Sequence, residues 1–557
     1  MNVNEHELKD ILAAGETLTV EFKSDVKGLP DRDLVAAAVA MANTEGGLIL
    51  LGVEDNGTVT GVQSNHQDSA GVVAMIANRT SPSVSVRADV IEWDRKKILR
   101  VQVPKTRGIV STSDGLLLRR RLMASGKPEA VPFYSHEIMQ RQSALGLIDP
   151  SAIPLTALTV EDLNPLERQR IREAIRRYGG DMTLLPLADE ELDGALGLVV
   201  TVEGVRRPTV AGLLIMGRED VLRQHIPAHE IAFQVLDGTE VRVNEFFRKP
   251  LLQTFEEIEL LFKARVTEQE IQVGLFRVPI PNYDRRAFRE GFINSLVHRD
   301  YSMLGAVHVR LDDHGLTVSN PGGFVEGITL HNILVTAPRS RNPLLADIVK
   351  RIGLAERTGR GIDRIYEGML RYGRPAPDYA MSDASSVVLV LHKSDADIKF
   401  LEMILTCEER TGTAMPIDSL IILSRLRQER RLTTSDLTED TQKSEQATRT
   451  ALEKLVEAGL VEAHGTGRGR TYTLSAKVYR HAGQKTAYIR QAGFDPIQQE
   501  QMVLKFIEKH GRIKRADVAE LCKISPFQAT RLLKRLAEEG KIVPEGKGKG
   551  TFYELRL

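Results

Sequence analysis

The stretch AMANTEGGLILLGVEDNG, residues 40–57, contains a continuous apolar run, LILLGV, that ends in the turn signal Glu-Asp-Asn-Gly. Such a run is typical of a strand that is buried on both faces. The segments LTVEFKS (18–24) and KILRVQVP (97–104) are also strand-like, and DRDLVAAAVAMAN (31–43) predicts a helix between the first two strands. These elements predict an α+β domain over residues 1–138.

The composition is that of an ordinary globular protein. The 557 residues include 75 Lys and Arg and 75 Asp and Glu, so the formal net charge is zero, and 42% of the residues are hydrophobic. These values exclude a fully disordered chain, and no apolar run reaches the ~18–20 residues that span a bilayer. The first ten residues carry no signal segment, and Cys407 and Cys522 provide neither a disulfide framework nor a zinc-site spacing. We therefore expect a cytoplasmic protein with no membrane partner and with both cysteines in its core.

The rest of the chain divides into further segments, as ~150 residues per domain predicts for this length. Residues 139–165 are rich in Ser, Pro and Leu and are expected to form a linker. Residues 166–395 carry mixed α/β signals, with strands expected at TVAGLLIMG (209–217), AVHVRL, GLTVSN and SSVVLVLH. Residues 398–480 and 497–557 are expected to be two small helical units of one plan. The predicted fold class is thus multidomain α+β.

Acidic side chains gather at the ends of the first two predicted strands. Glu21 and Lys23 share one face of a strand because side chains repeat with a period of two, and Glu16 precedes them. Asp55, or alternatively Glu54, follows the second strand. Carboxylates at adjacent strand ends could hold a divalent cation beside a lysine that contacts phosphate, which is the arrangement for metal-assisted phosphodiester hydrolysis. Exposed glutamates and an acidic turn are the ordinary alternative.

EFKSD (21–25) and AMANTEGGLILLGVEDNGTVTGV (40–62) resemble the Schlafen-type AlbA-like domain, over roughly residues 12–135. The resemblance implies nucleic-acid binding. In some members it also implies RNA cleavage with Mg or Mn, through a Glu-x4-Glu-x-Lys pattern and a later acid. In this chain the pattern is met by Glu16, Glu21 and Lys23, with Asp55 or Glu54 as the later acid, and these acids would be the metal ligands.

Three consecutive arginines follow on a later predicted strand. Arg119 and Arg121 are candidate phosphate contacts of this domain. A charged edge strand that resists association is the alternative.

The middle region lacks a P-loop but carries three other motifs. FREGFINSLVHRDY (288–301) has helix period and places Glu290, Asn294 and His298 at i, i+4 and i+8. A Glu and an Asn four residues apart can share a magnesium ion and a water. The second motif, SNPGG (319–323), ends a strand in a glycine turn. The third, RTGRGI (357–362), precedes a helix, where backbone N–H groups and the helix dipole favour a phosphate, although such glycine pairs are most often plain loops.

The order of these motifs resembles the Bergerat (GHKL) ATP-binding fold, an α/β sandwich. REGFINSLVHRDY, SNPGGF, RSRNPLLADI and ERTGRGIDRI more closely resemble the divergent ATPase-like domain behind the AlbA-like domain in bacterial regulators, over roughly residues 205–395. The resemblance implies that Glu290 polarises the attacking water, that Asn294 holds magnesium and that glycines and arginines contact phosphates. Asn320 stands where that fold normally has an adenine-binding Asp. The expected ATP site comprises Glu290, Asn294, His298, Asn320, Gly322, Gly323, Arg339, Arg341, Gly359 and Gly361.

The C-terminal segment 497–557 follows the helix-turn-helix plan with a wing. Residues 501–557 hold thirteen Lys and Arg against seven Asp and Glu, a basic module on a neutral body. The helix after Ser525 is the candidate recognition helix, and it resembles that of winged-helix regulators. The candidate DNA contacts are Arg531, Lys534 and Arg535 on this helix and Lys547 and Lys549 at the wing tip.

Residues 401–475 repeat the same plan. Ser444 is expected to cap a second candidate recognition helix, which carries Arg449, and Arg468 and Arg470 lie at the tip of its wing. DNA contact is favoured by the basic wing tips of both copies, and protein contact is the alternative use of a winged helix.

Together these motifs favour a cytoplasmic, homo-oligomeric transcriptional regulator that binds ATP with Mg and that binds DNA or RNA. The rival interpretation is an enzyme, a nuclease that depends on Mg or Mn and is targeted by its winged helices. An ATP-driven remodeller of nucleic acid is a third interpretation, which the lack of a P-loop disfavours.

Overall fold

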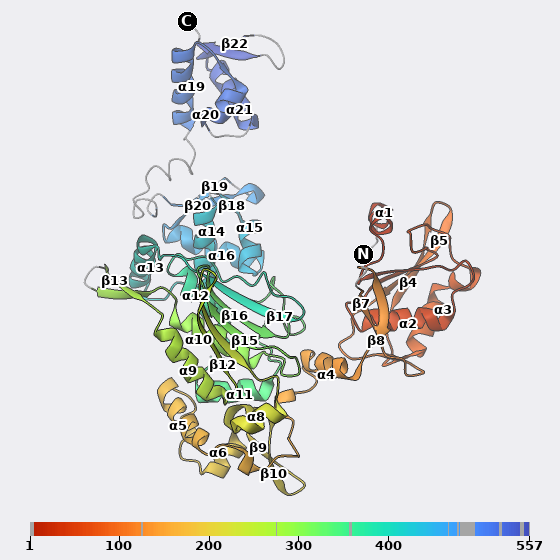
Figure 1. Ribbon diagram of the computed structural model, residues 1–557. Coiled ribbons are helices and arrows are strands. Elements are labelled where there is room, and N and C mark those ends of the chain that lie inside the picture. The colour runs from red at the N-terminus through yellow and green to blue at the C-terminus, as the bar shows by residue number, and fades with distance from the viewer. Residues whose placement is uncertain are drawn as a thin grey trace.

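The structure is a computed structural model. It describes residues 5–123, 126–273, 276–355, 359–429, 431–465, 467–475, 478, 496–522, 526–545 and 551–555. Figure 1 shows an N-terminal domain set to one side, a central sheet with helices below it, and two small helical domains above it. The predicted multidomain α+β class is confirmed.

The N-terminal domain is built on a four-stranded sheet of order β1-β2-β5-β4. Its strands are β1 (Val20–Lys23), β2 (Gly47–Leu51), β5 (Lys96–Val103) and β4 (Arg87–Trp93), and β1 pairs with β2 in parallel. The predicted strands and the predicted helix, α2 (Asp31–Ala42), are confirmed. Because side chains alternate along a strand, Ile49 and Leu51 of β2 pack in the core that contains α2, while Leu50 packs with Phe22 on the opposite face.

Shorter elements complete this domain. Gly47 has a φ of +137°, and a Cβ there would lie 2.1 Å from the carbonyl oxygen of Thr19, so only glycine allows β2 to approach β1 so closely. The remaining elements are α1 (Glu5–Ala14), α3 (Ser69–Asn78), β3 (Thr80–Ser81), β6 (Ser111–Thr112) and the hairpin of β7 (Leu118–Leu122) and β8 (Pro128–Pro132).

The segment that follows is packed against the central part of the chain. Residues 139–165, expected as a linker, begin within α4 (Ser135–Ala144), and they contribute Leu158 and Leu163 to the largest hydrophobic core. The next elements are α5 (Leu166–Tyr178), α6 (Asp189–Ala195), α7 (Val210–Met216), α8 (Glu219–His225) and α9 (Leu251–Lys263), with a hairpin of β9 (Val199–Val202) and β10 (Val205–Pro208). Figure 1 shows α5, α6, α8 and this hairpin below the central sheet.

The strand predicted at 209–217 is wrong, because these residues form α7. Thr209 caps the helix by accepting a hydrogen bond from the backbone N–H of Gly212, and Gly212 lies so close to Leu198 that a Cβ would meet its carbonyl oxygen at 1.9 Å. A fully buried apolar run has no polar face, so its periodicity cannot distinguish a strand from a helix.

The central sheet has five strands in the order β12-β11-β15-β16-β17. The parallel pair is β11 (Ile231–Asp237) with β15 (Val307–Leu311), and the other pairs are antiparallel. The other strands are β12 (Glu240–Phe247), β16 (Gly315–Pro321) and β17 (Ser386–His392), so the three remaining strand predictions are confirmed. Helix α10 (Arg285–Val297) packs on β15 and β16 and against α12 (Gly361–Leu370). Also present are α11 (Pro343–Ile352) and a hairpin of β13 (Glu268–Val273) and β14 (Phe276–Pro281).

The two C-terminal units share one order of elements, a helix, a short strand, two helices and a hairpin, and the first unit has a further helix, α13, before them. The first comprises α13 (Ile398–Thr411), α14 (Ile417–Gln428), β18 (Leu432–Thr433), α15 (Thr434–Thr441), α16 (Glu445–Glu457), β19 (Val461–His464) and β20 (Thr471–Leu474). The second comprises α19 (Pro496–His510), β21 (Ile513–Lys514), α20 (Arg515–Cys522), α21 (Pro526–Glu538), β22 (Ile542–Glu545) and β23 (Phe552–Leu555). Cys407 and Cys522 are free and buried, as predicted.

The first of these units is docked on the central part of the chain. Leu370 from α12 is a member of its hydrophobic core, and Leu334 and Tyr366 pack against that core. Arg427 of α14 donates to the carbonyl oxygen of Gly373 at 3.1 Å, and Arg371 forms an ion pair with Glu408 of α13. Apolar and polar contacts therefore both fix this unit to the sheet-bearing region.

Candidate nucleotide-binding site

Helix α10 presents the first predicted motif to a cavity. The helix begins after Asp284, whose side chain accepts hydrogen bonds from the backbone N–H groups of Arg286 and Ala287. Phe288 and Phe292 are buried, and Phe288 stacks on Phe262 with ring centroids 3.7 Å apart. This packing fixes the rotation of the helix about its axis. The side chains at i, i+4 and i+8, Glu290, Asn294 and His298, all line the cavity.

The cavity has a volume of about 250 Å³ and is bounded by α10, the end of β16, the segment 324–340 and the start of α12. Eight of the ten residues predicted for the ATP site line it: Glu290, Asn294, His298, Asn320, Gly323, Arg339, Gly359 and Gly361. Gly322 and Arg341 are not among the lining residues. Motifs that are separated by up to about 70 positions in the sequence thus meet at one site.

The side chain of Glu290 lies directly against the backbone of Gly361 at the cavity wall. A Cβ at Gly361 would lie 2.0 Å from Oε1 of Glu290. Gly361 is the first residue of α12, and its N-cap, Arg360, makes no side-chain capping bond, so the N–H groups of this helix end lack that common partner. Gly359 has a φ of +76°, and a Cβ there would lie 2.9 Å from Cγ of Pro338. A Cβ at Gly361 would therefore displace the Glu290 carboxylate, and one at Gly359 would meet the Pro338 ring in a backbone conformation that favours glycine.

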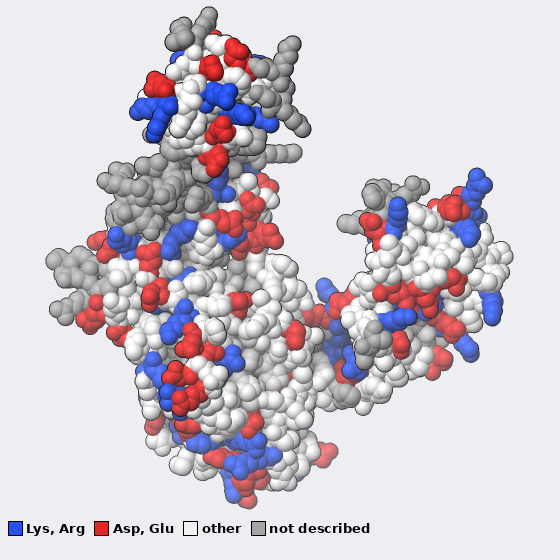
Figure 2. Space-filling model, turned by 45° about the horizontal axis from the view of Figure 1, so that its top comes forward, with Lys and Arg blue, Asp and Glu red and all other residues white. Residues whose placement is uncertain are grey.

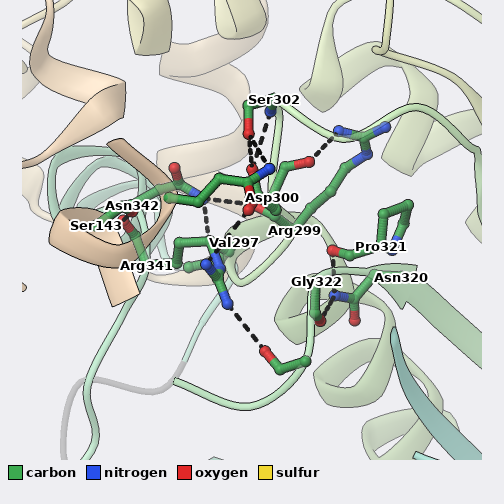
Figure 3. Close-up of polar contacts among 12 residues, drawn as sticks. Ser143, Val297, Arg299, Asp300, Ser302, Asn320, Pro321, Gly322, Arg341 and Asn342 are labelled. Atoms are coloured by element: carbon green, nitrogen blue, oxygen red, sulfur yellow. Dashed lines mark hydrogen bonds and ion pairs between the residues drawn. The ribbon is translucent and has the colours of Figure 1, made fainter. Parts of the chain in front are cut away.

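Asn320 is held by the backbone at the end of β16. It is 5% exposed, and its Nδ2 donates to the carbonyl oxygen of Pro321 at 3.1 Å and to that of Gly322 at 3.5 Å (Figure 3). Both of these bonds need a hydrogen-bond donor at position 320. An aspartate would instead place a carboxylate against two carbonyl oxygens, so the amide fits these partners. Because Nδ2 is used by the backbone, Oδ1 is the atom of this amide that can accept a hydrogen bond from a ligand.

Gly322 and Arg341 belong to a polar cluster beside the cavity, which Figure 3 shows. The buried guanidinium of Arg341 lies 3.4 Å from the carboxylate of Asp300 and donates to the carbonyl oxygen of Gly323 at 3.0 Å. Asn342 donates to the carbonyl oxygens of Val297 and Arg299 at 2.8 and 2.9 Å. This cluster ties the end of α10 to the glycine turn and to the start of α11, so the structure gives Arg341 protein partners and does not bring it to the cavity wall.

Several cavity residues were missed by the sequence analysis. Lys350, in the last turn of α11, lines the cavity together with Ser340 and Asp363. A lysine near a helix C-terminus is usually read as a surface residue that complements the helix dipole, so nothing in the local sequence marked it. Tyr379, also at the wall, forms a tilted aromatic pair with Phe324, and burial raises the pKa of its phenol.

Burial at the cavity shifts the pKa values of two side chains. Burial, followed by the nearby charges of Arg341 and Lys350, lowers the pKa of His298 to about 4. His298 is therefore neutral at pH 7 and offers a hydrogen-bond donor or acceptor, not a positive charge. Burial raises the pKa of Asp363, and Arg360 and Lys443 oppose that shift.

The predicted metal ligands of the N-terminal domain are arranged differently. Glu21 forms ion pairs with Lys23 through one carboxylate oxygen and with Arg120 through the other. Glu16 accepts a hydrogen bond from the backbone N–H of Phe22 at 2.8 Å, and Asp55 is exposed in its turn. Within the part of the chain that the structure describes, no three His, Cys, Asp or Glu side chains lie together as a metal site. These residues do not fit a metal as they stand, and nuclease activity remains a prediction from the resemblance.

The three arginines of β7 alternate between the interior and the surface. Arg120 is buried, Arg121 is exposed, and Arg119 forms an ion pair with Glu137 and lies 5.9 Å from the ring of Phe133. Arg121 is thus the exposed member of the pair predicted to contact phosphate.

The candidate DNA contacts lie mainly on exposed helix faces. Arg449 is exposed on α16 and pairs with Glu445 at 2.9 Å, and Arg470 lies 5.4 Å from the ring of Tyr472. On α21, Arg531 and Lys534 are exposed. Arg535 is half-buried near Glu500 and Glu539. Figure 2 shows lysines and arginines on the C-terminal domain, with acidic residues between them. The side chain of Arg468, together with Lys547 and Lys549, lies outside the described residues.

Comparisons with protein families match four parts of the chain, each less than half of its length. Residues 16–125 match "Schlafen, AlbA_2", and residues 305–391 match "Putative ATP-dependent DNA helicase recG C-terminal". Residues 410–555 match "DNA glycosylase AlkZ-like", and residues 137–232 match a domain of unknown function. The chain therefore contains a Schlafen AlbA-like region, an ATPase-like region of the recG C-terminal type and an AlkZ-like C-terminal region. The first two agree with the resemblances seen in the sequence, while the AlkZ-like match was not foreseen.

Comparison with solved structures gives a match over the full length. The DIP2311 protein from Corynebacterium diphtheriae is 22% identical, with a TM-score of 0.51, over 99% of this chain and 98% of that chain. This likeness shows a shared fold. The mRNA-binding domain of elongation factor SelB from E. coli, in complex with SECIS RNA, is 15% identical over 25% of this chain and 98% of that chain, and its TM-score of 0.14 is too low to support an argument. No curated protein matches the chain.

Among the described residues, no helix has both the length and the apolar character needed to cross a membrane.

Proposed function

We propose that the chain is a nucleic-acid-binding transcriptional regulator whose central region binds ATP with Mg²⁺. The observation that carries the proposal is the cavity in which α10, the glycine turn after β16 and the glycine pair before α12 meet. The match of residues 305–391 to an ATPase-like family supports the same assignment. Association of the chain with a second copy remains a prediction.

The groups on the cavity wall suit the parts of ATP. The Oδ1 atom of Asn320 can accept a hydrogen bond from the exocyclic amine of adenine, and Phe324 and Tyr379 provide apolar surface nearby. Lys350 and Arg339 provide positive charge for phosphates. Oxygens of Glu290 and Asn294 are suitable ligands for Mg²⁺, which would neutralise phosphate charge when bound. Glu290 would orient the water for hydrolysis.

Asn320 is expected to set the preference for adenine. The Asn320→Ala variant removes the acceptor, so its affinity for ATP should fall by about tenfold, which corresponds to the ~1.4 kcal/mol of a typical hydrogen bond. GTP presents a carbonyl where ATP presents the amine, so the wild-type chain should bind ATP more tightly than GTP and the variant should lose this preference. Isothermal titration with both nucleotides in the presence of Mg²⁺ measures the two effects. Equal wild-type affinities for ATP and GTP would contradict the assignment of Asn320.

The second winged helix is proposed as a DNA-binding module. Its candidate recognition helix, α21, exposes Arg531 and Lys534, and a helix of this kind enters the major groove while basic side chains contact phosphates. The AlkZ-like match over residues 410–555 also supports a DNA-related role.

The double variant Arg531→Ala/Lys534→Ala is expected to weaken duplex DNA binding at every sequence tested. If both side chains contact phosphates, the slope of log K against log salt should fall by roughly 1.8, since each contact contributes about 0.9. Fluorescence anisotropy at several salt concentrations measures the slope. Arg176→Ala/Arg177→Ala, two exposed arginines of α5, is the matched control and should leave the slope unchanged. An unchanged slope in the α21 variant would exclude α21 as the DNA-contacting helix.

A further inference from the structure

One wall of the cavity is a segment without helix or strand, residues 325–338. Ile328, Ile333 and Leu334 of this segment line the cavity. Leu334 also packs against the core of the first winged helix, and one side chain of that unit is hydrogen-bonded to the segment. Gln442 accepts a hydrogen bond from the backbone N–H of Leu334 at 2.9 Å and donates one to the carbonyl oxygen of Leu330 at 2.7 Å. Both functional groups of this amide are therefore used to fix the cavity wall.

Gln442 occupies the turn of the first helix-turn-helix. It lies between α15 and α16 with a φ of +56°, in the left-handed region, and Ser444 two residues later caps α16. In proteins of this plan the first turn of the second helix makes the contacts to bases. The residue that fixes the wall is thus adjacent to the helix end that would contact DNA.

Other contacts keep the winged helix docked independently of Gln442. The Arg371–Glu408 ion pair, the hydrogen bond from Arg427 to the carbonyl oxygen of Gly373 and the insertion of Leu370 into the core all lie outside the turn. A change at Gln442 should therefore remove the two hydrogen bonds to the wall segment without separating the two domains, while the packing of Leu334 remains.

We propose that Gln442 is a positioning residue of the nucleotide site. Through the same two hydrogen bonds, a bound nucleotide changes the access of DNA to the first turn of α16. This inference rests on the proposed function, because it requires the cavity to bind a nucleotide. If the nucleotide binds better when the wall is held by Gln442, thermodynamic linkage requires that the nucleotide strengthens the contact of Gln442 with the wall. Nucleotide occupancy and the DNA-contacting turn are then coupled through one side chain.

The variant Gln442→Asn tests the two hydrogen bonds of Gln442 without adding backbone strain. Asparagine tolerates the left-handed conformation and keeps an amide, but its side chain is shorter by one carbon–carbon bond of about 1.5 Å, so it cannot reach Leu330 and Leu334 together. Gln428→Asn is the matched control, because Gln428 is exposed at the end of α14 in the same domain. Gln442→Glu keeps the acceptor for Leu334 and loses the donor to Leu330.

The experiment uses the full chain with ATP and Mg²⁺. We expect ATP affinity, measured by calorimetry, to fall by about tenfold in Gln442→Asn, to fall less in Gln442→Glu and to be unchanged in Gln428→Asn. We expect ATP to slow hydrogen exchange at residues 325–338 and 441–450 in the wild type, and only at 325–338 in Gln442→Asn.

The outcomes separate this inference from the proposed function. If the wild type binds ATP and Gln442→Asn binds it equally well, the role of Gln442 is overturned while nucleotide binding stands. If ATP leaves exchange at residues 441–450 of the wild type unchanged, the coupling to α16 is overturned even where a variant fails to fold. If the wild type binds no ATP, both the proposed function and this inference fail.

Discussion

Replacement of Arg120 by alanine is expected to destabilise the N-terminal domain by about 3–5 kcal/mol, the range found when one partner of a buried ion pair is removed. Arg120 is 3% exposed and is paired with Glu21, and it donates to the carbonyl oxygens of Thr17 and Val20 at 2.7 and 3.1 Å. The substitution would leave the Glu21 carboxylate buried without its arginine and would release β7 from β1.

Urea unfolding followed by tryptophan fluorescence measures this effect in the full chain. Trp93, on β4, is the single tryptophan of the sequence, so its emission reports on the N-terminal domain alone. Arg121→Ala changes the exposed neighbour on the same strand and should alter the free energy of unfolding by less than about 0.5 kcal/mol. Equal unfolding midpoints for the two variants would show that the buried pair contributes little to the stability of this domain.

The second large effect is expected at Gly361. In Gly361→Ala the new Cβ would meet Oε1 of Glu290 at 2.0 Å, so the carboxylate must move into the cavity or α12 must move away from α10. Overpacking of this kind costs about 1–3 kcal/mol. If that cost falls on the bound state, ATP affinity decreases by about 5- to 150-fold. Calorimetric titration with ATP and Mg²⁺ gives the affinity directly.

The matched control for this variant is Gly194→Ala. Gly194 lies in α6, and a Cβ there would have no neighbour within 4 Å, so ATP affinity should not change. A normal affinity in Gly361→Ala would mean that Glu290 can move without loss of binding, and it would contradict the assignment of the Glu290–Gly361 contact to the nucleotide site.

Local sequence patterns predicted the elements that carry the site better than they predicted its polar contacts. The spacing of Glu290, Asn294 and His298 was enough to place all three on one wall, because the helix period fixes their directions. The helix period could not show that Arg341 turns towards Asp300 and Gly323, since that choice depends on where the glycine turn after β16 lies. Gln442 was missed for a similar reason: its partners, Leu330 and Leu334, are 112 and 108 positions away in the sequence.

The arginines of β7 show a second limit of prediction from sequence patterns. A period of two predicts that Arg120 faces away from Arg119 and Arg121, but it does not predict which face is buried. The choice follows from packing of the hairpin on α2, where the backbone N–H of Arg120 donates to the Thr44 side chain at 2.8 Å. That packing places Arg120 beside Glu21, so a carboxylate predicted as a metal ligand was found in an ion pair.

The position of Leu370 has a practical consequence for work with fragments of this protein. A fragment ended near residue 395 would lack α13 and α14, and it would expose Leu370, Tyr366 and Leu334, which pack with these helices in the intact chain. A fragment begun near residue 398 would lose one buried leucine from its own interior. Removal of a large apolar side chain from a core typically costs 2–5 kcal/mol, so both pieces should be prone to aggregate. The sheet-bearing region and the first C-terminal unit should therefore be produced and crystallised as one piece.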